Sequence, residues 1–319
     1  MLDARRECLA ERGSHTNMRK LRASDITLPV GVESWEDLQG LGRELPGWMF
    51  RGHSDLRWRL QPTLERWVQT HGGTQADIEQ HLLREWPCRV SQWLPDAPHL
   101  HDAMGWLAIM QHYGGPTRLL DLTTSLLVAT FFALEEAADS GHSVVWAIND
   151  AVVRGRLEQI LCDTDGVRIP CRDALDAGDL LNLTLGAKYE GPAAAAGVPR
   201  AASSRERIQK GRFLFGLNLD YSLEQNLYGM FDVSPEDVYP RSLVGWFKNP
   251  LNERLVEKLR RRPVIKIFID NRVRQPVLRE LEENGVSRTS LFPESDAWTA
   301  CMQEELRATL LSLSDGTPR

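Results

Sequence analysis

The chain has 319 residues, of which 42% are hydrophobic and 26% charged, and its formal net charge is −6. This composition excludes a disordered or fibrous protein, and the acidic balance argues against a protein whose whole surface binds nucleic acid. The longest apolar stretch, Ser125 to Leu134, is shorter than the roughly 20 residues that span a bilayer. Five scattered cysteines without a Cys-x-x-Cys pair suit a reducing compartment. The sequence therefore predicts a folded cytoplasmic protein with no membrane segment and no bound metal.

The succession of periodic segments predicts the fold class. Helical and strand patterns alternate without an internal repeat, which favours a single α+β domain with a central mixed or antiparallel sheet and flanking helices. Residues 1–31 are polar, lack a clear period and are interpreted as a flexible N-terminal arm. The domain is expected over residues 32–300, and a C-terminal helix and tail over residues 301–319.

The first half of the domain has mainly helical patterns. Ser34 is expected to cap a helix, because its hydroxyl can accept from the free N–H groups of the first turn. Apolar residues at helical spacing predict further helices. These expected elements are a strand over 48–51, helices over 76–93 and 101–112, and a buried helix that begins at Thr123 or Thr124 and runs to Asp139.

The second half has fewer periodic signals. Residues rich in β-branched side chains predict strands, and Gly285 is expected to end a helix because glycine adopts positive φ at little cost. The expected elements are strands over 143–148, 207–215 and 264–269, a loop over 191–197, and a helix over 275–284.

The segment from Gln111 to Ser125 is the strongest candidate for a functional site. Gly114, Gly115 and Pro116 must end the preceding helix, since glycine adds backbone freedom and proline disfavours the helical conformation before it. His112 and Tyr113 are thereby placed at a helix C-terminus, which favours a cationic imidazole.

Arg118 and Asp121 follow in the same segment, three residues apart. One interpretation is a structural ion pair that fixes the loop, with Leu119 and Leu120 facing inward. The other is that the planar guanidinium of Arg118 binds an anion such as phosphate. The two roles are compatible.

A second candidate is Arg51, which follows an apolar strand and precedes Gly52. Gly52 is expected to interrupt that strand and to let a backbone or ligand approach closely. The guanidinium would then emerge beside exposed backbone, a placement that suits a pyrophosphate or carboxylate. His53 is interpreted as solvated, and the tryptophans of this half as core residues rather than base-stacking platforms, namely Trp58, Trp67, Trp86, Trp93 and Trp106.

A third candidate lies between Glu206 and Phe213. Strand alternation would put Arg207, Gln209 and Gly211 on one face. If Gln209 is buried, its amide needs partners, and either the hydroxyl groups of a ligand or the backbone can supply them.

Taken together, these segments resemble the FRG-domain family. The family is named for a Phe/Tyr-Arg-Gly motif, which is Phe50-Arg51-Gly52 here, and the likeness continues through Gln111-His-Tyr-Gly-Gly-Pro-Thr-Arg-Leu-Leu-Asp121 and Arg207-Ile-Gln209-Lys-Gly211. It extends from about Trp48 to Pro293. The layout of these motifs is also similar to ADP-ribosyltransferase folds, an analogy at the level of the fold.

The family resemblance by itself implies no particular reaction. The similarity of the layout to ADP-ribosyltransferase folds implies an enzyme that cleaves NAD and passes ADP-ribose to a macromolecule, in a toxin or phage-defence setting. Its catalytic residues would be Gln209, His112 and Glu206. Those that bind NAD would be Arg51, Gly52, Tyr113, Thr117, Arg118 and Asp121.

Two alternatives stay open. A nuclease-type toxin would use His112 with Arg118 and Asp121 and would act without NAD. A non-catalytic nucleotide-binding or sensing module would bind the ligand without turnover. The acceptor of ADP-ribose is expected to be a protein or a nucleic acid.

Overall fold

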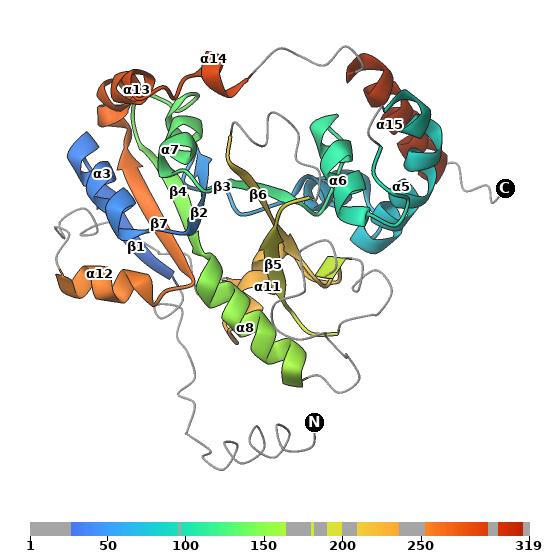
Figure 1. Cartoon of the computed structure of the whole chain (residues 1–319), viewed down its shortest axis with the longest axis horizontal. Helices are drawn as coiled ribbons and strands as arrows, with labels where there is room; N and C mark the ends of the chain where they lie inside the picture. The colour runs from blue at the N-terminus through green and yellow to red at the C-terminus, as the bar shows by residue number, and fades with distance from the viewer. Residues whose placement is uncertain are drawn as a thin grey trace.

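The computed structural model describes residues 27–94, 97–163, 180–181, 190–199, 209–235, 253–292 and 299–314. Within these ranges the chain forms a mixed sheet of seven strands in the order β1-β7-β4-β2-β3-β6-β5 (Figure 1). Strand β1 runs parallel to β7, and the other neighbouring strands are antiparallel. The predicted α+β class with a mixed central sheet is confirmed. The strands are β1 (Thr27–Val32), β2 (Trp48–His53), β3 (Leu120–Thr123), β4 (His142–Asn149), β5 (Ala194–Gly197), β6 (Gly211–Gly216) and β7 (Val264–Asp270).

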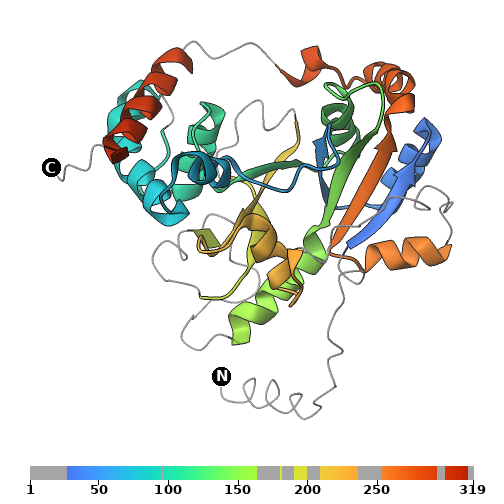
Figure 2. The same ribbon diagram turned by 180° about the vertical axis from the view of Figure 1, so that it is seen from behind.

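Helices cover both faces of the sheet (Figures 1 and 2). One face buries an apolar cluster against α3 (Trp35–Glu44), α7 (Leu126–Leu134), α12 (Glu253–Arg260), α13 (Arg274–Glu283) and α14 (Arg288–Leu291). The other face packs against α6 (Ala103–His112), α8 (Asp150–Asp163) and α11 (Leu223–Gly229). A third apolar cluster joins α6 to α4 (Thr63–His71), α5 (Gln75–Val90) and α15 (Thr299–Ser314). Two 3₁₀ turns, Ser91–Trp93 and Asn271–Val273, complete the described helices.

Several predicted elements are confirmed with their end signals. The hydroxyl of Ser34 accepts from the Asp37 N–H at 3.1 Å and begins α3. The strands expected over 143–148 and 264–269 are β4 and β7, and Gly285 follows α13 with a φ of +78°. These signals are local, so sequence alone is enough to find them.

The helix expected from Thr123 or Thr124 starts later than predicted. Thr123 belongs to β3, and its hydroxyl donates to the Gln209 carbonyl at 2.6 Å and accepts from the Ser125 N–H at 3.1 Å. Ser125 caps α7 instead, and the helix ends at Leu134. Pairing of β3 with β6 overrides the helical pattern of these residues.

Three further segments depart from the sequence interpretation. The alanine run within 191–197, expected to be a loop, forms strand β5, which pairs with β6. The strand expected over 207–215 begins at Gly211, after a turn at Gln209 and Lys210. Residues 27–31, placed in the N-terminal arm, are most of β1, an edge strand in which Pro29 and Gly31 hide the strand pattern.

Candidate functional site

A pocket of about 790 Å³ lies where strands β2 and β3 separate. The two strands share a single register pair, Phe50 with Thr123. Beyond this pair, β2 continues along β4 as far as His53, while β3 continues along β6 as far as Leu120. The sheet therefore parts at this point, and side chains from both strands line the opening.

The pocket brings together three segments that are distant in sequence. Arg51 and Gly52 come from β2, His112 and Asp121 from the segment Gln111 to Asp121, and Gln209 from the turn before β6. The fold thus brings the three candidate segments of the sequence together at one cavity. Glu206, the remaining predicted catalytic residue, lies outside the described residues.

Arg51 spans the gap between the two strands. Its Nη1 donates to the Asp121 carbonyl at 2.7 Å and its Nε donates to His53 Nε2 at 2.9 Å. Burial lowers the pKa of the guanidinium, and the carboxylate of Asp121 opposes that effect. An arginine stays protonated under such conditions, so the pocket holds a fixed positive charge.

His53 is buried and neutral. Burial, followed by the charge of Arg51, lowers the pKa of His53 to about 3. Because Nε2 accepts from Arg51, the ring proton lies on Nδ1, which is 3.4 Å from the Trp58 carbonyl. The interpretation of His53 as a solvated side chain is therefore wrong; the histidine positions Arg51.

The Asp121 carboxylate is held by a chain of polar side chains. Gln111 Nε2 donates to Asp121 Oδ1 at 2.7 Å, and Gln111 Oε1 accepts from the Thr117 hydroxyl. The Thr117 N–H in turn donates to the Thr63 hydroxyl at 2.9 Å. Asp121 is exposed, and of the described residues that line the pocket it is the one carboxylate. The arrangement presents a preorganised negative charge beside Arg51.

Gly52 has a steric role in the fold. A Cβ at this position would lie 1.9 Å from the Ala129 carbonyl oxygen and 2.5 Å from the Ala133 nitrogen. The close approach expected beside Gly52 is therefore made by the backbone of α7. The glycine sits inside β2 and does not interrupt it.

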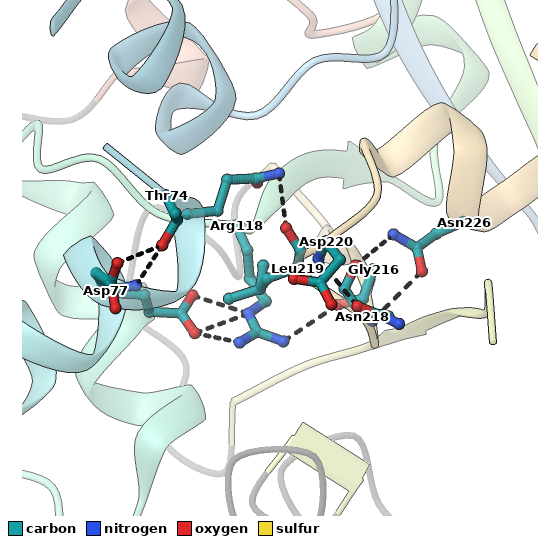
Figure 3. A network of polar contacts seen from close by, with 10 residues as sticks. Thr74, Asp77, Arg118, Gly216, Asn218, Leu219, Asp220 and Asn226 are labelled. Atoms are coloured by element: carbon teal, nitrogen blue, oxygen red, sulfur yellow. Dashed lines mark hydrogen bonds and ion pairs between the residues drawn. The ribbon is translucent and has the colours of Figure 1, made fainter. Parts of the chain in front are cut away.

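Arg118 lies away from the pocket, in a buried network that links α5 to the residues after β6 (Figure 3). Its Nε lies 2.9 and 2.8 Å from the two Glu79 carboxylate oxygens, and its Nη1 donates to the Gly216 carbonyl at 3.2 Å. The expected pair between Arg118 and Asp121 is not formed, although Leu119 and Leu120 are buried as predicted. The guanidinium of Arg118 is thus part of the core.

The other predicted residues divide between pocket and core. Tyr113 is buried beside Trp86, and Thr117 is buried under Gln111, so neither lines the pocket. His112 is exposed in the pocket wall. Gln209 is half-buried, and its Nε2 donates to the Leu291 carbonyl at 3.0 Å, so the backbone is one of its two expected kinds of partner.

Sequence reasoning missed several pocket residues. Gln111 was not predicted as a site residue in its own right, although it begins the segment Gln111 to Ser125. Trp58 was predicted to be a core residue, but it lines the pocket and is 55% exposed. Arg59 and Arg66 also line the pocket. Arg57-Trp58-Arg59 marks exposed charges on both sides of the tryptophan, but the same alternation occurs in half-buried strands, so the sequence alone could not place Trp58 at the pocket.

Glu65, on α4, is a buried carboxyl group next to Arg66, which lines the pocket. Glu65 accepts from the Leu223 N–H, and burial, with Glu224 nearby, raises the pKa of Glu65 from 4.5 to about 7. The folded state therefore binds a proton that the unfolded chain releases near pH 4.5.

We expect stability to depend on pH through Glu65. Its contribution is fully present below pH 4.5 and is lost as the pH rises through about 7. The loss is on the order of 2–3 kcal/mol. Urea unfolding at a series of pH values between about 4.5 and 8 checks this. The Glu65→Gln variant, which keeps the acceptor but cannot ionise, should show a flatter curve; identical curves for the two proteins would exclude Glu65 as the cause.

The described residues contain no group of three or more His, Cys, Asp or Glu side chains suited to a metal ion. Nor do their helices include one with the length and apolar character to cross a membrane.

The fold and the pocket define a mixed α+β protein with a polar cavity at the parting of its sheet. Comparison with protein families identifies the segment that forms most of this cavity: residues 46–142 match the FRG domain. The resemblance inferred from Phe50-Arg51-Gly52 and from the segment Gln111 to Asp121 is confirmed over these residues; the likeness expected further along the chain, as far as Pro293, lies beyond the match. No curated protein and no solved structure matches the chain.

Proposed function

We propose that the pocket binds NAD and that the protein transfers ADP-ribose from NAD to a macromolecule. The supporting observation is that a guanidinium, Arg51, and an oriented carboxylate, Asp121, line the same cavity. NAD has a diphosphate that a guanidinium can bind, and a ribose whose bond to nicotinamide breaks with development of positive charge. A cavity of about 790 Å³ is also within the usual range for small-molecule sites.

In this mechanism Arg51 binds the diphosphate and Asp121 lies beside the reacting ribose. Nicotinamide leaves with the electron pair of the C–N bond, and the carboxylate stabilises the oxocarbenium-like transition state. A nucleophile of the acceptor attacks ribose C1′ and loses its proton to His112. NAD and the acceptor thus yield ADP-ribosyl acceptor, nicotinamide and a proton.

Gln209 has a supporting role in the proposal. Its Nε2 is committed to the Leu291 carbonyl, so Oε1 is the atom that would accept from a ribose hydroxyl. Asp121 supplies the carboxylate for which Gln209 is a weak substitute, because a neutral amide stabilises positive charge less well than a carboxylate does. An ADP-ribosyltransferase-like fold, cytoplasmic location and a toxin or phage-defence role belong to the same proposal.

The alternative functions differ in their support. The nuclease hypothesis needs Arg118 at the site, but Arg118 is paired with Glu79 in the core. A non-catalytic nucleotide-binding module requires the same pocket as the transferase and differs only in turnover.

The decisive experiment measures NAD binding by calorimetry and nicotinamide release with cell extract as acceptor source. We expect Asp121→Asn to slow nicotinamide release by about 10²–10³-fold, since a preorganised charge is removed from the transition state. Binding of NAD should change much less, because the asparagine keeps the oxygen that accepts from Gln111. Arg51→Ala should instead weaken NAD binding.

Matched controls come from the exposed pair on α5, Arg84 with Glu85, which does not line the pocket. Arg84→Ala and Glu85→Gln should match the wild type. An unchanged rate for Asp121→Asn would contradict the mechanism, and absence of NAD binding would contradict the proposal. Binding without nicotinamide release would favour the non-catalytic module.

A further inference from the structure

The mouth of the pocket carries an exposed tryptophan flanked by arginines. Arg57, Trp58 and Arg59 follow β2, and their side chains are 83%, 55% and 50% exposed. Arg66, on α4, is exposed as well, and all four residues line the pocket. We call these four residues the rim.

Trp58 is held in place from beneath. Its backbone N–H donates to the Asp55 carbonyl at 3.1 Å, and its ring meets the edge of the His53 ring, with centroids 5.9 Å apart and planes inclined by 67°. Among the described residues the exposed large hydrophobic side chains are Trp58, Leu100, Val198 and Leu311, so Trp58 is the one aromatic side chain among them. An indole fixed at one edge and open to solvent suits stacking with a planar group.

The arginines of the rim are anchored by neighbouring groups and remain exposed. Arg66 Nη1 donates to the Gln61 carbonyl at 3.0 Å, Arg59 Nε lies 3.7 Å from a Glu224 oxygen, and Arg57 binds Asp55. A guanidinium has five N–H donors in a planar fork, so the exposed arginines of the rim can turn such donors toward an anion. Within the stretch 57–66 the acidic residue is Glu65, whose side chain is buried against Leu223.

We propose that the rim is a docking surface for single-stranded nucleic acid, with a base stacked on Trp58 and backbone phosphates bound by Arg59 and Arg66. A duplex keeps its bases stacked on one another, so only a single strand can offer a base to an isolated indole. An acidic peptide would satisfy the arginines but would leave Trp58 unused. If the protein is the transferase proposed above, the docked strand is the acceptor of ADP-ribose; this last step rests on the proposed function.

The test uses fluorescence anisotropy of the full-length protein with a labelled oligonucleotide of about 12 nucleotides. The same strand in a duplex and an oligoglutamate of equal charge serve as competing ligands, at several salt concentrations. We expect the single strand to bind most tightly and Trp58→Ala to weaken it about tenfold or more, while Trp58→Phe keeps most of the affinity. The plot of log K against log salt has a negative slope, and each arginine removed from the rim should reduce the magnitude of that slope by about 0.7.

Controls separate the rim from general surface effects. Leu100→Ala removes another exposed hydrophobic side chain, and Arg84→Ala removes an exposed arginine outside the pocket. Both should bind the strand as the wild type does, and circular dichroism verifies that every variant is folded. Equal affinity for the strand in Trp58→Ala and wild type, tighter binding of the acidic peptide, or no binding at about 0.15 M salt would overturn the proposal.

The two proposals can fail separately. Strand binding that depends on Trp58, in a protein that does not bind NAD, would keep the docking surface and reject the transferase. NAD cleavage with proteins as the sole acceptors, and no strand binding, would keep the transferase and reject the docking surface.

Discussion

Replacement of Arg118 by alanine is expected to destabilise the protein by about 3–5 kcal/mol, because it leaves the Glu79 carboxylate buried without its partner. Both side chains are almost completely buried, and the guanidinium contacts both carboxylate oxygens and the Gly216 carbonyl. Urea unfolding at neutral pH measures the loss directly.

Two control variants separate the loss of the buried ion pair from the general effect of removing an arginine. A double variant, Arg118→Met with Glu79→Met, removes both charges and should be more stable than either single variant. Arg84→Ala breaks an exposed pair and should cost less than about 1 kcal/mol. A stability of Arg118→Ala within about 1 kcal/mol of the wild type would show that the pair does not anchor α5 to the sheet.

Substitution of Gly52 by alanine is expected to cost about 3 kcal/mol or more, at the upper end of the range for overpacking. The added Cβ would overlap the Ala129 carbonyl oxygen and the Ala133 nitrogen, and helix backbone cannot yield as a flexible side chain does. Helix α7 must therefore move away from β2. Since Ala129 and Phe132 of α7 line the pocket, ligand affinity should fall together with the melting temperature.

Gly155 offers the matched control. It lies in α8, and a Cβ there would have no neighbour within 4 Å. Gly155→Ala should be neutral or stabilising by up to about 1 kcal/mol, because alanine favours a helix over glycine. If both glycine variants melted like the wild type, the contact between β2 and α7 would be more compliant than its geometry implies.

Local signals in the sequence predicted much of the fold. Caps such as Ser34 and Gly285, and the buried strands β4 and β7, depend on residues within a few positions of one another. Strands β1 and β5 escaped prediction for the opposite reason. Pro29 and Gly31 interrupt the pattern of β1, and the alanines of β5 have weak strand propensity, so pairing with β7 and β6 decides their conformation.

The candidate site divides in the same way. Its location was predictable, because Arg51, the segment around His112 and Gln209 carried unusual residue types. The hydrogen-bond and ion-pair partners of these residues could not all be predicted from the sequence. Arg118 pairs with Glu79, which is 39 positions away, and no local pattern marks that carboxylate as its partner. The contact of Arg51 with His53 joins residues two apart on β2, which share a face, and it was missed because the strand was expected to end at Arg51.

The single register pair between β2 and β3 has a consequence for motion. It leaves the sheet as two hydrogen-bonded halves, β1-β7-β4-β2 and β3-β6-β5, joined by little main-chain bonding. A hinge-like rotation of one half against the other would widen or narrow the cavity while both ladders stay intact. The bond from Arg51 to the Asp121 carbonyl crosses the seam between the halves and would restrain such a rotation.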